Sequence, residues 1–273
     1  MAAPYTKYLR MNRIPHMWCP GCGIGIIVKA LTRAFDALEW SPDDLALISG
    51  IGCTSRAPGY MNMHTLHTTH GRAISFATGV KFARPNKHVV VISGDGDASA
   101  IGGNHLIHAC RRNIDMTLVI VNNFIYGMTG GQYSPTTPVG ARAATSPWGN
   151  IDIPFNIAEL AKGAGASYVA RGHVGSGVQL ERLIRGGLDH KGFSVIEVLS
   201  NCHTQYGRRN RLADPIDLID HIAKSTVNIR KAAKMSDGDM EGKYFVGLIH
   251  KDENRREYCK GYEQVIERAQ MSK

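Results

Sequence analysis

Two cysteines near the N-terminus, Cys19 and Cys22, are separated by a Pro-Gly pair in a tight loop that precedes a helical pattern. This spacing places two thiols within reach of one metal ion, as in a zinc half-site, although a redox dithiol has the same spacing. Cys53 and Cys202 each follow a predicted strand and are the candidates for two further ligands. Four thiolates suit either Zn²⁺ or a [4Fe–4S] cluster, and spacing does not separate the two. The remaining cysteines fall in a predicted helix and in the C-terminal tail and are expected to be structural: Cys110 and Cys259.

A second cluster, Gly94-Asp95-Gly96, directly follows an apolar run and precedes a predicted helix. Its glycines let the backbone approach phosphate oxygens, and the N–H groups at a helix start favour anions. Asp95 would repel a diphosphate unless a divalent cation such as Mg²⁺ lay between them. Asn122-Asn123 follows about one helix and one strand later, and Asn123 would add a side-chain oxygen to that cation. The alternative is a helix start capped by Asp97, with the two asparagines as a strand-ending turn.

Short β-branched and aliphatic runs alternate with helical patterns along the chain, which predicts an α/β fold with a doubly wound, mostly parallel sheet. In such a sheet, ligands bind outside the carboxyl ends of the strands, so the cysteine, glycine and asparagine clusters are expected to converge on one edge. The expected strands are 45–49, 89–93, 117–121, 167–170 and 194–199. The expected helices are 25–38, 98–112, 156–163 and 178–188, with an amphipathic helix at 257–271.

The composition bounds the class of protein. Hydrophobic residues make up 43% of the 273 residues and charged residues 20%, as in globular proteins. The net charge of +9 comes from scattered Lys and Arg with no nucleic-acid signature, so no nucleic-acid partner is expected. No apolar run is long enough to cross a membrane and no signal-peptide pattern is present, which predicts a cytoplasmic protein whose cysteines stay reduced.

The glycine and asparagine clusters resemble the motif of thiamine-diphosphate enzymes. Together with the stretches 18–23 and 50–53 and the late Cys202, they resemble the β subunits of 2-oxoacid:ferredoxin oxidoreductases. The resemblance implies the thiamine-diphosphate-binding fold of the diphosphate-binding type, with Mg²⁺ held by Asp95, Asn123 and the carbonyl of Ile125. It further implies a [4Fe–4S] cluster on the cysteines Cys19, Cys22, Cys53 and Cys202. The implied cofactor-binding residues are Ile51, Gly52, Cys53, Thr54, His70, Asp95, Gly96, Asp97, Asn123, Ile125, Gly127, Met128 and Thr129.

Three histidines, His64, His67 and His70, recur every third residue and could suggest a metal site, but no carboxylate accompanies them. The stretch 70–73 again resembles the family, in which this histidine approaches the cofactor or substrate. His70 is therefore the candidate catalytic residue. The alternative is a histidine that hydrogen-bonds a neighbouring loop.

The resemblance also implies an enzyme that is incomplete alone. No glutamate occurs between Glu39 and Glu159, and the resemblance implies that an α subunit supplies the glutamate that activates thiamine, in an (αβ)2 assembly. The segment 127–135 resembles the lining of the substrate pocket, and Gly130 stands where some broad-specificity members carry Lys, which favours 2-oxoglutarate over pyruvate and other 2-oxoacids. Coenzyme A would accept the acyl group, and ferredoxin the electrons.

Residues 1–211 are expected to form the thiamine-diphosphate- and cluster-binding domain, and residues 212–273 a helical tail that packs on the domain or the partner subunit. Two other functions remain open at this stage. A non-redox thiamine decarboxylase would keep the Gly-Asp-Gly loop and hold zinc on its cysteines. A non-catalytic electron carrier would use the cysteines and have lost thiamine binding.

Overall fold

The structure is a computed structural model that describes residues 3–232 and 235–271. Its strands are β1 (Leu45–Ser49), β2 (His64–His67), β3 (His88–Gly94), β4 (Met116–Asn122), β5 (Ile125–Tyr126), β6 (Gln132–Tyr133), β7 (Tyr168–His173), β8 (Phe193–Leu199), β9 (Thr226–Asn228) and β10 (Tyr244–Lys251). Its α-helices are α1 (Ile24–Ala37), α2 (Ala73–Ala83), α3 (Gly103–Arg112), α4 (Ile157–Gly163), α5 (Gly177–Asp189), α6 (Pro215–Lys224), α7 (Ile229–Ala232), α8 (Asp237–Met240) and α9 (Tyr258–Met271). Shorter helical turns are η1 (Pro4–Tyr8), η2 (Met11–Arg13), η3 (Pro42–Asp44), η4 (Thr54–Tyr60), η5 (Asp97–Ile101) and η6 (His203–Gly207).

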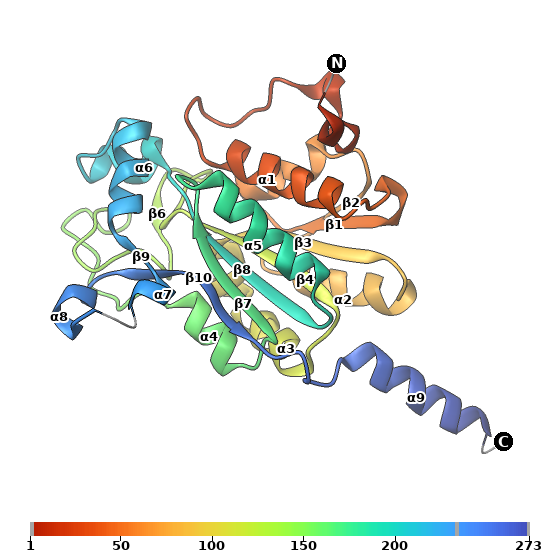
Figure 1. The fold of residues 1–273 in the computed structure, drawn as a ribbon. Coiled ribbons are helices and arrows are strands. Elements are labelled where there is room, and N and C mark those ends of the chain that lie inside the picture. Colours follow the sequence, from red (N-terminus) through yellow and green to blue (C-terminus); the bar gives the residue numbers. More distant parts are fainter. Residues whose placement is uncertain (1–2, 233–234, 272–273) are drawn as a thin grey trace.

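Within the described residues, eight strands form one sheet in the order β2-β1-β3-β4-β8-β7-β10-β9 (Figure 1). The strands from β2 to β7 in this order run parallel, and β10 is antiparallel to β7. The predicted doubly wound, mostly parallel sheet is therefore confirmed. All five predicted strands are present, as β1, β3, β4, β7 and β8.

Helices cover both faces of this sheet (Figure 1). On one face α1 and α5 pack on alternate side chains of the strands, and on the other face α2, α3 and α4 do so. Every residue of β4 and β8 is buried, and burial on both faces explains why most of their residues are apolar, without the alternation of a half-exposed strand. Two apolar cores thus hold the central strands in place and fix the loops at their ends.

The strand register brings the chemically informative loops to one edge. Ser49 at the end of β1 pairs with Ile92, and Gly94 at the end of β3 pairs with Val121. At the end of β4, Asn122 pairs with Leu199. Because these strands are parallel neighbours, the loops that follow them leave the sheet on the same side. The expected convergence of the clusters is confirmed.

Several elements escaped the sequence pattern. β2 is an exposed edge strand made of His-Thr-Leu-His, so it lacks the apolar run that marks a buried strand. In α2, Phe76 and Phe82 are exposed on a helix whose interior also holds Gly79, which weakens the amphipathic signal. The predicted helix over 98–112 is divided, since η5 is a π-helical turn and α3 follows it.

The C-terminal segment is not helical throughout, which corrects one expectation. Residues 257–271 form the expected helix as α9, which projects from the body at the C-terminal end (Figure 1). However, β9 and β10 lie in the main sheet, where β10 pairs with β7. The apolar residues of β10 extend the sheet beyond β7. The sequence did not predict this strand, because charged residues flank its apolar run. The division at residue 211 stays a prediction.

No helix within residues 3–232 or 235–271 combines the length and the apolar character needed to traverse a lipid bilayer. The tail helices α7 and α8 are single turns.

Candidate active site

One pocket lies at the edge of the sheet where the parallel strands end. Its residues come from four loops: the loops after β1, β3 and β4, and the loop between β2 and α2. Its lining comprises Ile51, Gly52, Cys53, Thr54, His70, Gly94, Asp95, Gly96, Asp97, Asn123, Ile125, Tyr126, Gly127, Met128 and Thr129. Every residue that the sequence analysis assigned to the cofactor lies in this lining. The structure brings these residues together, and their contact with a cofactor stays a prediction.

Asp95 lies at the floor of the pocket with 2% of its surface exposed. The hydroxyls of Ser134 and Thr136 both donate to its Oδ2 at 2.6 Å. Burial raises the pKa of the Asp95 carboxyl to about 6, against the opposing effect of these hydroxyls and of nearby backbone N–H groups. Both of these side-chain partners are neutral hydroxyls. A buried carboxylate with dipoles but without a cation is a site that a metal ion would stabilise.

The turn after β4 forms another wall of the pocket, which carries Asn123 and Ile125. Phe124 adopts a left-handed conformation with φ +65°, which is rare for a bulky residue. The side-chain oxygens of Asn122 and Asn123 accept from the backbone N–H groups of Phe124 and Ile125, at 3.2 and 3.4 Å. Thr137 donates to the Phe124 carbonyl at 2.6 Å. These contacts hold Asn123 and Ile125, the other two expected Mg²⁺ ligands, against the pocket.

Asp97 is buried and its carboxylate already has protein partners. Oδ2 accepts from the Ser93 hydroxyl at 2.6 Å, and Oδ1 accepts from the backbone N–H groups of Gly71 at 2.7 Å and Ile51 at 3.4 Å. No side-chain cap hydrogen bond is made at the start of η5, so the capping alternative for Asp97 is wrong. The carboxylate faces the neighbouring loops because Gly50 lacks a side chain there.

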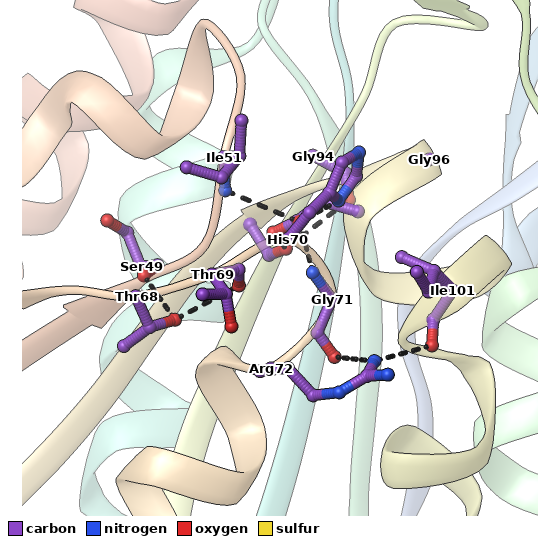
Figure 2. A network of polar contacts seen from close by, with 12 residues as sticks. Ser49, Ile51, Thr68, Thr69, His70, Gly71, Arg72, Gly94, Gly96 and Ile101 are labelled. Carbon is purple, nitrogen blue, oxygen red and sulfur yellow. Dashed lines mark hydrogen bonds and ion pairs between the residues drawn. The ribbon is translucent and has the colours of Figure 1, made fainter.

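His70 is the partner that connects this carboxylate to the pocket. Its Nδ1 lies 2.5 Å from Asp97 Oδ1, and 39% of the side chain is exposed on the pocket side. Figure 2 shows the imidazole beside Ile51 and above Gly71, with the dashed contacts that join these loops. The Nδ1 atom is buried and has no aligned hydrogen bond, so the alternative of a histidine that hydrogen-bonds a neighbouring loop is not met at Nδ1. His64 and His67 lie on β2, and no group of three metal-binding His, Cys, Asp or Glu side chains forms among residues 3–232 and 235–271.

Four cysteines approach one another directly behind the pocket wall. A side chain at Gly127 would begin 3.2 Å from Cys202 Sγ and 3.9 Å from Cys53 Sγ. The hydroxyl of Thr204 lies 3.8 Å from Cys202 Sγ and 3.9 Å from Cys19 Sγ. Cys22 lies near enough to feel the charge of the other three.

Burial raises the pKa of the Cys22 thiol to about 12 and that of Cys53 to about 11, and the neighbouring cysteines add to both shifts. Thiolates crowded in this way repel one another unless cations lie between them. Four thiols are the donor type of a zinc or iron–sulfur centre, although no three of them form a group that could hold a single metal ion among the described residues. By contrast, Cys110 and Cys259 are buried in the core that α2, α3 and α4 share with the sheet, as expected of structural cysteines.

Comparison with known proteins identifies the family. Residues 50–198 match the thiamine pyrophosphate enzyme, C-terminal TPP binding domain. The chain is 49% identical over 265 residues to 2-oxoglutarate synthase subunit KorB of Methanocaldococcus jannaschii, covering 97% of this chain and 98% of that one. It belongs to the family of 2-oxoacid:ferredoxin oxidoreductase β subunits.

Two further proteins support this family assignment. The 2-oxoglutarate oxidoreductase subunit KorB of Mycobacterium tuberculosis is 45% identical over 185 residues, 68% of this chain and 50% of that protein. A solved 2-oxoglutarate:ferredoxin oxidoreductase from Magnetococcus marinus, with 2-oxoglutarate, coenzyme A and succinyl-CoA bound, superimposes with a TM-score of 0.86. It is 35% identical and covers 98% of this chain and 91% of that chain. The resemblance and the enzyme class inferred from the sequence are confirmed.

Some residues of this family site escaped the sequence analysis. Thr136 and Thr204 flank the expected ligands, and Ser134, which lies in the predicted segment 127–135, holds Asp95. Hydroxyl residues are common in loops, so neither these positions nor the contact of Ser134 with Asp95 carried a spacing signal. Tyr126 was also missed; its hydroxyl donates to the Gly96 carbonyl at 3.1 Å. Trp18 donates its indole N–H to the Cys53 carbonyl at 2.8 Å, which connects the two cysteine loops. Only the Trp-Cys sequence itself could have suggested that last contact.

Proposed function

We propose that this chain is the thiamine-diphosphate half of an enzyme that converts 2-oxoglutarate, coenzyme A and oxidised ferredoxin to succinyl-coenzyme A, carbon dioxide and reduced ferredoxin, reversibly. One observation carries this proposal. Gly127 lines the pocket, and a Cβ atom added to it would lie 3.2 Å from Cys202 Sγ and 3.9 Å from Cys53 Sγ. A redox centre on these cysteines would therefore lie against a cofactor in the pocket. Names of family members that act on 2-oxoglutarate support the choice of substrate.

The acidic side of the pocket would hold Mg²⁺ and the diphosphate. Asp95, Asn123 and the carbonyl of Ile125 supply the oxygen ligands, which are those that Mg²⁺ prefers. Ser134 and Thr136 fix the Asp95 carboxylate before any ion binds. Because the Asp97 carboxylate is occupied by other loops, its contribution to the diphosphate would come from its backbone. Bound thiamine diphosphate would supply a ring that stabilises negative charge on carbon.

The cysteine side would hold a [4Fe–4S] cluster on Cys19, Cys22, Cys53 and Cys202. The alternative of one zinc ion is less favoured, because the four thiols do not close into a group that could hold a single ion within the described residues. A larger iron–sulfur centre suits wider spacing. Trp18 donates to the Cys53 carbonyl and fixes that loop, and the Thr204 hydroxyl would donate to the sulfurs of Cys19 and Cys202, a kind of contact that tunes a cluster's potential. The non-catalytic electron carrier is also less favoured, since the thiamine pocket retains its buried Asp95.

The choice of 2-oxoglutarate is supported by one arginine near the substrate segment. Arg209 donates to the Gly130 carbonyl at 3.1 Å and to both oxygens of Gln205, at 3.0 and 2.6 Å. None of these partners is a carboxylate, so none of them neutralises the charge of the guanidinium. The second carboxylate of a dicarboxylic 2-oxoacid would provide the missing counter-charge, whereas pyruvate has none.

A partner subunit would complete the site. The pocket lining of the described chain contains no glutamate. Beside the pocket, Tyr126 and Tyr133 also line a groove with Ile153 and Phe155, and Ile153 is 89% exposed. Apolar side chains of this size are normally covered in the assembled state. We assign this face to the α subunit, in an (αβ)2 assembly in the cytoplasm that passes electrons to ferredoxin. Residues 1–211 would bind the cofactors, and the segment 212–273 would support them.

Coexpression with the α subunit tests the function. The purified complex is assayed anaerobically by viologen reduction with coenzyme A and 2-oxoglutarate, pyruvate or a branched 2-oxoacid, and the acyl product is identified by mass spectrometry. Succinyl-coenzyme A formed fastest with 2-oxoglutarate is the expected result. Equal rates on all substrates would overturn the substrate choice. Carbon dioxide release without viologen reduction would establish the non-redox decarboxylase instead.

An Arg209→Met variant of the complex sharpens the substrate test. Loss of the cation should raise KM for 2-oxoglutarate about tenfold or more and leave KM for pyruvate unchanged. Arg208→Met, at an exposed neighbouring position, is the matched control. An equal rise for both substrates would assign Arg209 to loop structure.

A further inference from the structure

The Asp97 carboxylate is enclosed on all sides by protein groups, although Asp97 lines the pocket. It accepts from Ser93, Gly71 and Ile51, and a side chain at Gly50 would begin only 2.1 Å from its Oδ2. Asp95, two residues earlier, is held by hydroxyls on one oxygen. The two aspartates of the loop therefore face different partners, and Asp97 is turned toward the loop that carries His70.

That loop is fixed in place before any ligand binds. Gly71 has φ +67°, and a side chain there would begin 2.4 Å from Ile101 and 2.7 Å from the Gly102 backbone nitrogen. Thr68 donates its backbone N–H and its hydroxyl to the Ser49 carbonyl, at 2.7 and 2.9 Å. Arg72 donates to the Ile101 carbonyl at 3.1 Å (Figure 2). The backbone on both sides of His70 thus has little freedom, and only its side-chain torsions remain to be set.

We propose that Asp97 is a positioning residue for His70. Its Oδ1 lies 2.5 Å from Nδ1 of the imidazole, an ion-pair contact that is not aligned as a hydrogen bond, and Nδ1 is otherwise buried without a partner. Nδ1 would therefore carry the proton toward the carboxylate, and the neutral ring would keep its lone pair on Nε2. Because Nδ1 faces the buried carboxylate and the rest of the ring lines the pocket, Nε2 is presented to a bound ligand. The ring of Tyr126 lies edge-on, with ring centroids 6.0 Å apart, and limits rotation on the other side. The inference rests on the proposed function, in which the pocket binds the cofactor and the 2-oxoacid.

In this arrangement Nε2 accepts a hydrogen bond or a proton from an acidic O–H or N–H group of the bound ligand. The proton moves to Nε2, the ring becomes an imidazolium, and the negative carboxylate of Asp97 stabilises that positive charge across the Nδ1–H contact. The ligand keeps the electron pair of the broken O–H or N–H bond. No electron transfer is involved at this residue.

A structural role alone would explain the same contacts, because Asp97 also ties the loops at Ile51 and Gly71 together. Asp97→Asn separates the two roles. The amide keeps the size and an accepting oxygen for the two backbone N–H groups, and its NH₂ can donate to Ser93, but the negative charge is lost. Ser93→Ala is the matched control, since it removes a contact to the other carboxylate oxygen and leaves His70 untouched.

The test is a double-mutant cycle in the α–β complex, with kcat and KM for the 2-oxoacid as readouts. Asp97→Asn should lower kcat at least about tenfold with little change in KM, and Ser93→Ala should not. In a His70→Gln background, Asp97→Asn should have no further effect on kcat. A full additional effect in that background would overturn the inference, as would wild-type kcat in the single Asp97→Asn variant.

A second measurement does not depend on activity or on a stable variant. In the full chain with ¹⁵N-labelled histidine, the His70 signals are assigned by their loss in His70→Gln, and the ¹⁵N shifts report which ring nitrogen carries the proton. A protonated Nδ1 and an unprotonated Nε2 are expected in the neutral ring. A proton on Nε2 would overturn the inference. Failure of the wild-type complex to turn over any 2-oxoacid would overturn the proposed function and leave this measurement to decide the His70 geometry.

Discussion

The two sides of the pocket are prepared to different degrees. On the acidic side, Asp95 is buried, and the hydroxyls of Ser134 and Thr136 hold one of its oxygens at normal hydrogen-bond distances. On the cysteine side, Cys19 is exposed and Cys53 is partly exposed, and the contacts of the thiols are the long ones to Thr204. The acidic side is therefore formed by the protein itself, whereas under the proposed function a metal centre would hold the loops of the cysteine side together.

The largest effect is expected from Cys53→Ser. Loss of one of four thiolates should abolish cluster assembly and lower viologen reduction more than about 100-fold, because a hydroxyl is a poor ligand for iron. Thiamine diphosphate should still bind, since the acidic side does not depend on the cluster. Iron content, the visible spectrum and calorimetric titration of the cofactor give the three readouts. Cys110→Ala, in the core under α3, should keep its iron; equal loss in both variants would refute the assignment.

Asp95→Asn should have the converse effect. Without the carboxylate, Mg²⁺-dependent affinity for thiamine diphosphate should fall about 10- to 100-fold, while iron content stays at the wild-type level. Titration with and without Mg²⁺ measures this affinity, and Asp43→Asn, an exposed carboxylate, is the control. Loss of the cluster in Asp95→Asn would show that the two sides are not independent.

The positions of the pocket loops could be predicted from the sequence, but the partners of the side chains in those loops could not. The strand-ending clusters around Cys53, Asp95 and Asn123 were predictable, because buried β-branched strands mark where the loops begin and parallel order brings those loops to one edge. The partners of Asp95 were not, since Ser134 and Thr136 reach it from a loop far along the chain. The contacts of the Asp97 carboxylate with Ser93, Gly71 and Ile51 were not predictable either, because sequence position cannot tell which way a buried carboxylate turns. β10 was missed since its apolar run lies in a charged tail.

A smaller effect on the acidic side is expected from Ser134→Ala. The variant removes one of the two hydroxyl donors to Asp95, and a hydrogen bond to a charged group is worth about 1.5–3 kcal/mol. Mg²⁺ affinity should fall about tenfold, with Thr136 retaining the carboxylate in place. Titration of Mg²⁺ at saturating thiamine diphosphate measures the change. Unchanged affinity would mean that the hydroxyl does not prepare the site.

The smallest effect is expected at His190, which lies outside both sides of the pocket, and it concerns the stability of the fold. His190 is buried with Nε2 2.7 Å from the Ser167 hydroxyl, and burial lowers the pKa of its imidazole below the usual 6.5. The unfolded chain then binds the proton more readily, so the free energy of unfolding is highest above pH 6.5 and falls as the pH drops through the lower, folded value. Denaturant unfolding between pH 7.5 and 5.5, compared with His190→Asn, measures the slope. If the unfolding free energy of the variant depends on pH as steeply as that of the wild type, His190 is not the cause of the pH dependence.

The central claim is that one chain holds a diphosphate–metal site and an iron–sulfur centre on the two sides of one pocket wall. The direct measurement is anaerobic reconstitution of the full chain with iron, sulfide, Mg²⁺ and thiamine diphosphate, followed by iron, zinc and thiamine analysis of the desalted protein. About four irons and one thiamine diphosphate per chain are expected, with a brown colour that reduction bleaches. A colourless protein that retains zinc and no iron, or thiamine binding that excludes iron, would contradict it.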